Sequence, residues 1–520
     1  MMIRKLLLLL GLLSATAARA EWHEATSANF IVYSQGGANE AREFAARLER
    51  FNYVLRFYHG LRAPPAPNRL RVFLFPSIDA VGRMIEGDGV AGYYVDEARG
   101  LMMVGTRRGL ARSNDIRVAR QEALIDPESI LLHEYAHHFM HQYFPATYPT
   151  WYQEGFAEFW GATRFLPNNV VEVGRPANYR YVSLSFNRWL PVGQLLSAQS
   201  YADVPEVDLL YAQGWLLVRY TFENADRHRQ LQRYLTLING GRRYADAATE
   251  AFGDLGRLNT ELIGYGGRQR VNVLQLPFRE LPTGEIAERA LRPAEQALIE
   301  YEIRLAQGSI SRREIADFAN DLRPVATRFP DDPMALALLT EVERLAGNAA
   351  AAAAAAQRWA AVAPTDGRAL MHQALLQIDA LRAGRSTDAA AWSAARRLLV
   401  RANQLTPNNP LILEAYYDSY AAQDAPPPEP AQNALYTAME LAPGDGELRY
   451  RVALDFERRN MVAEAIAIIR PSAYRLPHPS TESERERRER EARERRELRA
   501  GREPRESARE MLARLEARQR

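Results

Sequence analysis

Apolar residues in the first part of the chain recur with both strand and helix spacing. A β-type run covers residues 30–33, and residues 70–75 alternate as a second strand. The runs at 92–95 and 101–104 are separated by a short turn, which predicts a β-hairpin. Between the first two strands, residues 38–58 carry apolar side chains at helical intervals: Phe44, Leu48, Phe51 and Leu55. This part of the chain therefore predicts mixed strands and helices.

Helical spacing begins again at residue 126. Asp126 followed by Pro127 is typical of a helix start, since the side chain can cap the first turn and proline suits the first helical position. This helix should extend to Gln142. A second helix is predicted from Trp151 to about Arg164, and further helices are expected between residues 190 and 265, including Tyr211–Glu223.

Turn signals recur in the second half of the chain, which is rich in alanine and predicts helices almost throughout. Four such signals begin at a proline, at intervals of 34, 43 and 36 residues: Pro330, Pro364, Pro407 and Pro443. A period of about 34 with helix, turn and helix between the signals resembles the tetratricopeptide repeat. Such units bury their apolar faces against their neighbours, which predicts a superhelix with a concave surface. A plain helical bundle is the alternative.

Composition divides the chain into segments. A stretch with several glycines and prolines, 266–283, predicts a linker between a first domain at 21–265 and the repeats at 284–475. Residues 476–520 form a tail dominated by Glu and Arg, for which we expect disorder or a solvated single helix. The predicted fold class is an α+β domain followed by an all-α tetratricopeptide-like superhelix.

The first twenty residues predict a secretory signal peptide, 1–20. A basic pair precedes the apolar run Leu6–Leu13, which is too short to span a bilayer, and small residues end at Ala18-Arg19-Ala20. We therefore expect a periplasmic or secreted protein without a stable membrane span after cleavage. An uncleaved anchor is the alternative.

Charge and cysteine content exclude several classes of protein. The chain has 66 basic and 64 acidic side chains, and this net charge of +2 gives no overall field for binding nucleic acid. It contains no cysteine, which excludes disulfides, cysteine nucleophiles and cysteine-based metal sites. Any metal site must therefore use histidine and carboxylate ligands.

Four of the nine histidines lie between residues 133 and 141, inside the predicted helix 126–142. His133 and His137 are four residues apart, so a helix presents both imidazoles on one face, where they can bind one metal ion. Glu134 lies beside them and offers the carboxylate that takes a proton from water in zinc-dependent hydrolysis. Seventeen residues after His137, the next predicted helix supplies Glu154 as a third ligand.

The segment around these residues resembles the gluzincins, the zinc metallopeptidases that include thermolysin and the aminopeptidase N-like enzymes. The string at 151–158, with Glu154-Gly155-Phe156-Ala157 after an aromatic residue, is similar to the segment that carries their third zinc ligand. The resemblance implies a zincin-like first domain, Zn²⁺ held by His133, His137 and Glu154, and Glu134 as general base. It also implies that Glu158 orients a zinc-binding histidine. The whole of 21–265 is most similar to the peptidase-MA-like domains of bacterial secreted proteins.

A second match is the string Tyr211-Ala212-Gln213-Gly214. In the aminopeptidase N-like enzymes a Tyr-x-Lys-Gly segment supplies a tyrosine that stabilises the tetrahedral intermediate, and the resemblance implies that role for Tyr211. Gln213 replaces the lysine, and a half-buried packing residue is the alternative. The Gly-Ala-Met-Glu-Asn signature for a free N-terminus is absent, so aminopeptidase specificity is not implied. His138 and His141 are expected at the surface or beside the ligands, not on the metal.

These features together predict a secreted zinc-dependent endopeptidase that acts on a peptide or protein substrate. The repeats are expected to bind a protein partner through their concave face. The hairpin around Gly100-Leu101-Met102-Met103 is a candidate edge along which an extended peptide aligns. An alternative from another class is an inactive zincin-fold scaffold that binds proteins through its repeats in the cell envelope. A metal-dependent hydrolase of non-peptide substrates is a further alternative.

Overall fold

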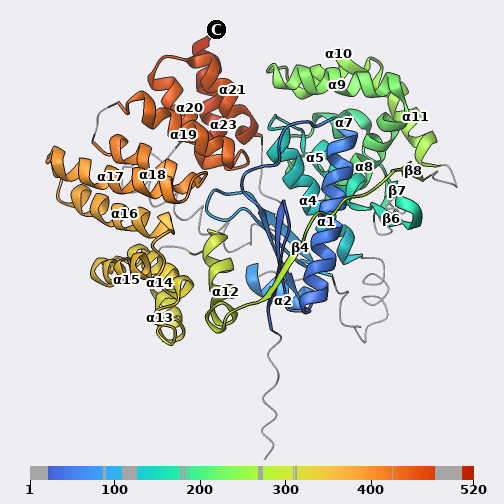
Figure 1. The fold of residues 1–520 in the computed structure, drawn as a ribbon. Coiled ribbons are helices and arrows are strands. Elements are labelled where there is room, and N and C mark those ends of the chain that lie inside the picture. The colour runs from blue at the N-terminus through green and yellow to red at the C-terminus, as the bar shows by residue number, and fades with distance from the viewer. Residues whose placement is uncertain are drawn as a thin grey trace, which may run out of the picture.

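The computed structural model has two regions, an N-terminal α/β region with a mixed sheet and a C-terminal all-helical region of repeating helix pairs (Figure 1). It describes residues 21–85, 90–107, 126–175, 180, 183–185, 187–267, 273–308, 310, 313–423, 426–474 and 506–519. The expected signal peptide, 1–20, lies outside these residues. Within them, no helix combines the length and the apolar character needed to span a bilayer.

A six-stranded mixed sheet forms the centre of the α/β region. Its strands lie in the order β4 (Gly92–Val95), β5 (Met102–Thr106), β3 (Leu70–Phe75), β2 (Phe30–Ser34), β1 (His23–Thr26) and β9 (Ala287–Ala290). β5, β3 and β2 are parallel, and the remaining neighbours pair antiparallel. The structure confirms both predicted strands and the predicted hairpin. Within that hairpin the edge is β4, because β5 is paired on both sides.

Alternating side chains of β3 enter two different cores. Val72 and Leu74 pack on one face with helices α1 (Ala38–Tyr58) and α4 (Pro127–Tyr143). Phe73 and Phe75 pack on the opposite face with α2 (Ile78–Ile85) and α12 (Pro293–Ala306). The sheet is therefore covered on both sides, and one of its covering helices comes from beyond residue 290.

A layer of helices lies beyond α4 and builds the rest of the α/β region. The first of these helices, α5 (Thr150–Gly161), ends before Arg164, where strand β6 (Arg164–Leu166) begins, so it is shorter than the apolar pattern predicted. A three-stranded sheet, β6 (Arg164–Leu166), β7 (Val170–Val173) and β8 (Leu274–Pro277), flanks the layer. The helices are α5 (Thr150–Gly161), α7 (Val192–Ser197), α8 (Val207–Glu223), α9 (Ala225–Asn239), α10 (Tyr244–Phe252) and α11 (Leu255–Gly266).

Helices in the C-terminal region follow one another as neighbouring pairs alongside the α/β region (Figure 1). After α13 (Ile315–Ala326), the pairs are α14 (Pro333–Leu345) with α15 (Ala349–Val362), α16 (Gly367–Ala383) with α17 (Ala389–Leu405), α18 (Pro410–Ala421) with α19 (Glu429–Leu441), and α20 (Gly446–Arg458) with α21 (Val462–Ala473). Each recurrent turn signal ends in a side chain that caps the first helix of a pair: Asp332, Asp366, Asn409 and Asp445. The periodic signals thus mark real helix starts.

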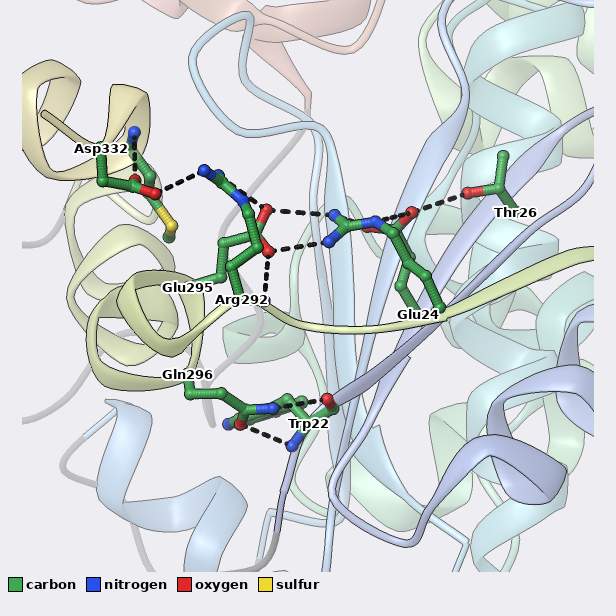
Figure 2. Close-up of polar contacts among 9 residues, drawn as sticks. Trp22, Glu24, Thr26, Arg292, Glu295, Gln296 and Asp332 are labelled. Carbon is green, nitrogen blue, oxygen red and sulfur yellow. Dashed lines mark hydrogen bonds and ion pairs between the residues drawn. The ribbon is translucent and has the colours of Figure 1, made fainter.

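Residues between the two regions are built into both. The stretch 266–283, for which we expected a linker, includes β8, which pairs with β7. The Gln296 side chain of α12 holds the backbone of Trp22, accepting from its N–H at 2.7 Å and donating to its carbonyl oxygen at 2.8 Å (Figure 2). Arg292, just before α12, forms an ion pair with Asp332 at the start of α14 (Figure 2). The first strand is therefore connected to the helix pairs through α12.

The last described helix, α23 (Ala508–Gln519), belongs to the expected tail at 476–520. It packs on α21, and its apolar side chains Met511, Leu512 and Leu515 are buried there. This part of the tail is therefore not a solvated helix, because three apolar residues at helical spacing give it a packing face. Residues 475–505 lie outside the described residues.

Candidate metal centre

Helix α4 places the two histidines of the metal motif side by side. The Asp126 side chain accepts a hydrogen bond from the Glu128 N–H at 3.1 Å, and Pro127 occupies the first turn. The helix thus begins at the predicted residue. The Nε2 atoms of His133 and His137 lie 3.1 Å apart. Both imidazoles therefore face one point, as their spacing of four residues predicts.

Glycines allow the helices of the site to approach closely. A Cβ atom on Gly161, at the end of α5, would lie 2.9 Å from the Cβ of His133. A Cβ atom on Gly155 would lie 2.4 Å from the carbonyl oxygen of Gly214 in α8. Any side chain at these positions would push the helices apart. The backbone contact lets α5 and α8 bring their polar side chains to the histidines.

Glu154, from α5, completes a group of three residues. Its Oε2 atom is buried and lies 3.3 Å from His133 Nε2 and 3.4 Å from His137 Nε2, and neither contact has hydrogen-bond geometry. Its other oxygen, Oε1, accepts a hydrogen bond from the Tyr201 hydroxyl at 2.5 Å. One carboxylate oxygen is thus held by the protein, while the other faces the two histidines.

The three converging atoms fit a tetrahedral metal ion. Zinc at about 2.0–2.1 Å from nitrogen and oxygen ligands separates neighbouring ligands by about 3.3 Å. The separations in this group are 3.1, 3.3 and 3.4 Å. Among the described residues, this is the one cluster of histidine and acidic side chains close enough to hold an ion. His133, His137 and Glu154 can therefore bind a metal ion.

Glu158 lies one turn after Glu154, on the far side of His133. Its Oε1 atom is 3.8 Å from His133 Nδ1 and accepts a hydrogen bond from Arg180 Nε at 2.8 Å. The carboxylate is thus beside the ring nitrogen that faces away from the metal group. This position is compatible with the prediction that Glu158 orients the His133 imidazole, which stays a prediction.

Two residues of this site had no signal that we recognised in the sequence. Arg180 lies over the ring of Tyr211, 4.1 Å from its centroid, and bonds Glu158. Tyr201 opens a one-turn 3-10 helix whose start is fixed by a capping box at Ser200. That Ser-x-x-Asp pattern can be found in the sequence and predicts a turn. It does not predict that the tyrosine hydroxyl reaches a carboxylate 47 residues earlier.

Glu134 is half-buried beside the ligand group. Burial raises its pKa; His133 lowers it, Glu154 and Glu158 raise it further, and a hydrogen bond from the backbone of Tyr94 lowers it, which leaves the value at about 7. A carboxylate with a pKa near neutrality can both take and release a proton at physiological pH. The predicted general base therefore has suitable acidity in the metal-free protein.

The ligand group is coupled by charge. Burial disfavours the charged form of His133, but Glu154, Glu158 and Glu134 together raise its pKa to about 9. Burial likewise opposes ionisation of Glu154, yet His137 and His133 hold its pKa well below the usual range. Burial lowers the pKa of His137. At neutral pH without a metal, His133 therefore carries a proton and Glu154 is ionised.

Tyr211, from α8, lies between a ligand and the tyrosine that holds another ligand. Its ring centroid is 6.4 Å from that of His133 and 6.2 Å from that of Tyr201, with nearly parallel planes. Burial, followed by the charge of Glu154, raises the pKa of Tyr211 well above the usual range. The hydroxyl is thus protonated at neutral pH. The structure brings this residue to the metal group, and its role toward an oxyanion stays a prediction.

The other two histidines of α4 lie outside the ligand group. His138 is buried, and its Nδ1 atom lies 3.0 Å from the Tyr94 hydroxyl of β4. His141 lies 3.1 Å from Asp96 Oδ2 through Nδ1 and 3.3 Å from Gln153 Oε1 through Nε2. The expectation that neither binds the metal agrees with these positions. His138 is buried and His141 is half-buried, because β4, its following turn and α5 lie against them.

Comparison with known proteins adds little to this geometry. No family model and no curated protein matches the chain. Among solved structures, a thermophilic TPR protein of Thermus thermophilus is similar at 18% sequence identity, over 35% of this chain and 90% of that chain, with a TM-score of 0.29. A TM-score this low does not define the fold of either region.

Proposed function

We propose that the protein is a secreted zinc metallopeptidase of gluzincin type that acts as an endopeptidase. The observation that carries this proposal is the convergence of three ligand atoms, from His133, His137 and Glu154, within 3.4 Å of one another. Three protein ligands that leave a fourth position open are typical of hydrolytic zinc sites. A carboxylate with a pKa of about 7, from Glu134, lies next to them.

Zinc held by these residues would supply Lewis acidity toward a peptide carbonyl and lower the pKa of water to about 7. Glu134 would accept the proton of the attacking water and return it to the leaving amine. Tyr211 would donate a hydrogen bond to the oxygen on which negative charge develops. Tyr201 would keep Glu154 in a single orientation, because it binds the oxygen that faces away from the histidines.

Strand β4 supports the choice of a peptide as substrate. Among the described residues it is an edge strand of the sheet, and it lies beside the metal helix: the Tyr94 hydroxyl is 3.0 Å from His138 Nδ1, and the Tyr94 backbone affects the pKa of Glu134. An extended peptide would align along such an edge by backbone pairing. A peptide bond would thereby lie close to the carboxylate of Glu134. A zincin-like fold for this region and tetratricopeptide-like repeats for the helix pairs are part of the same proposal.

Metal analysis of the full chain, combined with digestion of a peptide library and of unfolded proteins, tests this function. We expect one zinc ion per chain and cleavage that chelation abolishes. Glu134→Gln should keep the zinc and lower the rate by about 10² to 10⁴, since Glu134 is a base and not a ligand. His137→Ala, the matched control on the same helix, should lose both zinc and cleavage.

Three results would contradict the proposal, each in a different way. A chain that takes up no zinc would refute the metal site itself. A chain that binds zinc through these residues but cleaves none of the substrates would support the scaffold alternative instead. Loss of zinc in Glu134→Gln would show that the base and a ligand have been exchanged in our assignment.

A further inference from the structure

The turn between β4 and β5, residues 96–100, lies against separate parts of the helical region. The N–H of Ala98 donates a hydrogen bond to Asp445 Oδ2 at 2.8 Å, and Arg99 forms an ion pair with Glu341 of α14. Gly100 lies against the end of α12, where a Cβ atom would stand 2.5 Å from the Ala306 carbonyl oxygen. Helices that are far apart in sequence therefore hold one five-residue turn.

The closeness of this fit is set by glycines on both sides of the contact. Gly444 precedes α20, and a Cβ atom there would lie 2.4 Å from Asp96 Oδ2. The same oxygen of Asp96 lies 3.1 Å from His141 Nδ1 of α4. A larger residue at 444 would displace the turn. The turn is thus seated between the helix that carries the metal motif and the helix pairs.

Strand β4, which leads into this turn, reaches the proposed general base. The Tyr94 hydroxyl of β4 lies 3.0 Å from His138 Nδ1 on α4. The Tyr94 backbone lies close enough to Glu134, on the same helix, to lower the pKa of its carboxyl group. Within the part of the chain that the structure describes, β4 lies at an edge of the sheet and pairs with β5. Its position therefore depends on β5, on α4 and on whatever fixes the turn at its end.

The two oxygens of Asp445 have separate partners. Oδ1 caps α20, accepting from the N–H groups of Glu447 at 2.8 Å and Leu448 at 2.9 Å. Oδ2 accepts from Ala98 N–H, and the side chain is buried. A helix cap needs only the first oxygen. The second oxygen connects the helical region to the turn.

We propose that Asp445 of the helical region is a positioning residue for the active site, fixing the 96–100 turn and, through β4, the carboxylate of Glu134. The helix pairs then complete the catalytic centre in addition to offering a surface for partners. The kinetic part of this proposal rests on the proposed peptidase function. The structural part, that Asp445 holds β4, does not.

Asp445→Asn tests the proposal in the full chain. Asparagine caps a helix as well as aspartate does, so its oxygen stays on the N–H groups of α20. Its amide then presents a donor to the N–H of Ala98, and the hydrogen bond is lost. Asp388→Asn is the matched control. Asp388 caps α17 by accepting from the N–H groups two and three residues later, as Asp445 does in α20, but its side chain is exposed.

Amide hydrogen exchange and steady-state kinetics are the two measurements. We expect Asp445→Asn, and not Asp388→Asn, to speed exchange in peptides that cover residues 92–100, in the metal-free and the zinc-loaded protein alike. We expect kcat to fall about 10- to 100-fold, since small displacements of a catalytic group have effects of that size. The melting temperature and the zinc content should stay near those of the unchanged chain. KM should change less than kcat.

The outcomes separate this proposal from the proposed function. The role of Asp445 would be overturned if exchange at 92–100 did not change in Asp445→Asn, or if it rose by the same amount in Asp388→Asn. This holds whether or not the chain is a peptidase. Faster exchange together with an unchanged kcat would show that the turn moves without moving Glu134, and would also overturn it. If the unchanged chain cleaves nothing, the proposed function fails, and exchange alone decides whether Asp445 holds β4.

Discussion

The helix caps of the helical region and the polar groups of the candidate site in the α/β region find their partners at different distances along the chain. In the helical region, the side chains of Asp332, Asp366 and Asn409 cap N–H groups two or three residues later. In the α/β region, Glu154 bonds Tyr201, and the histidines that it faces lie on another helix. Caps with local partners thus start the repeated helices, whereas polar groups with distant partners form the candidate site.

Apolar packing shows the same contrast. The helical region has several separate cores between neighbouring helices, in which alanines pack against larger apolar and aromatic side chains. One large core extends through most of the α/β region, and a second core on the opposite face of its sheet includes Ile299 and Ile303 of α12. The boundary between local and distant packing therefore lies after α12, not at residues 266–283.

The largest expected effect concerns the metal ligands of the α/β region. Glu154→Ala should remove the third ligand and with it most of the zinc affinity. Glu158→Ala should weaken binding by about 10- to 100-fold, because it changes only the surroundings of His133. Zinc titration of both variants checks the order. A greater loss with Glu158→Ala would mean that ligand and orienting residue have been exchanged.

Tyr211→Phe should act on turnover without acting on the metal. Removing one donor to a developing oxyanion lowers turnover by about 10² to 10³, while the ring volume and the packing on His133 remain. Tyr201→Phe is the matched control, since it removes the hydroxyl that holds Glu154 and should lower zinc affinity first. The measurements are kcat, zinc affinity and melting temperature for both. Near-normal kcat in Tyr211→Phe would leave it as a packing residue.

A pair of isoleucines sharpens the boundary between the regions. Ile299 and Ile378 are equally buried, the first in α12 against the sheet and the second in α16 against its neighbours. Each change to alanine should cost about 2 to 5 kcal/mol. Hydrogen exchange should show lost protection in β3 and β5 for Ile299→Ala and only among helices α16 to α18 for Ile378→Ala. Identical patterns would mean that the two regions unfold as one unit.

The last prediction, whose effect between neighbouring pH values is modest, is the dependence of zinc binding on pH. His133 is protonated below a pKa of about 9 in the metal-free protein, and a zinc ligand must be neutral. Zinc affinity should therefore rise about tenfold per pH unit from pH 7 to 9 and then level off. His372, buried in the helical region with a pKa of about 4, has no proton to release in this range.

Calorimetry in buffers of different ionisation enthalpy measures how many protons are released when zinc binds. We expect about one proton released per zinc at pH 7. Glu158→Gln removes one charge that raises the pKa of His133, so it should reduce the release. Proton release that is absent in the unchanged chain would show that His133 is neutral before zinc arrives.

The sequence by itself determined the features that depend on near neighbours. The apolar spacing at 38–58 predicted α1, the Asp126-Pro127 pair predicted the start of α4, and the recurrent turn signals predicted turns between helices, where four helix starts are found. The spacing of His133 and His137 on that helix placed both imidazoles on one face. These are short-range properties, fixed by the 3.6-residue helical turn and by caps within three residues.

Only the tertiary structure decided which distant groups meet. The close contacts at Gly155, Gly161 and Gly214 set the distances among α4, α5 and α8. Tyr201 and Arg180 reach Glu154 and Glu158 from other segments, and no residue pattern shows where such a side chain will end. The contact of Asp445 with Ala98 spans 347 positions and depends on how α12 seats the helix pairs against the sheet. A hydrogen bond or a close backbone contact acts over a few ångströms, so its partners are known only when the whole chain has packed.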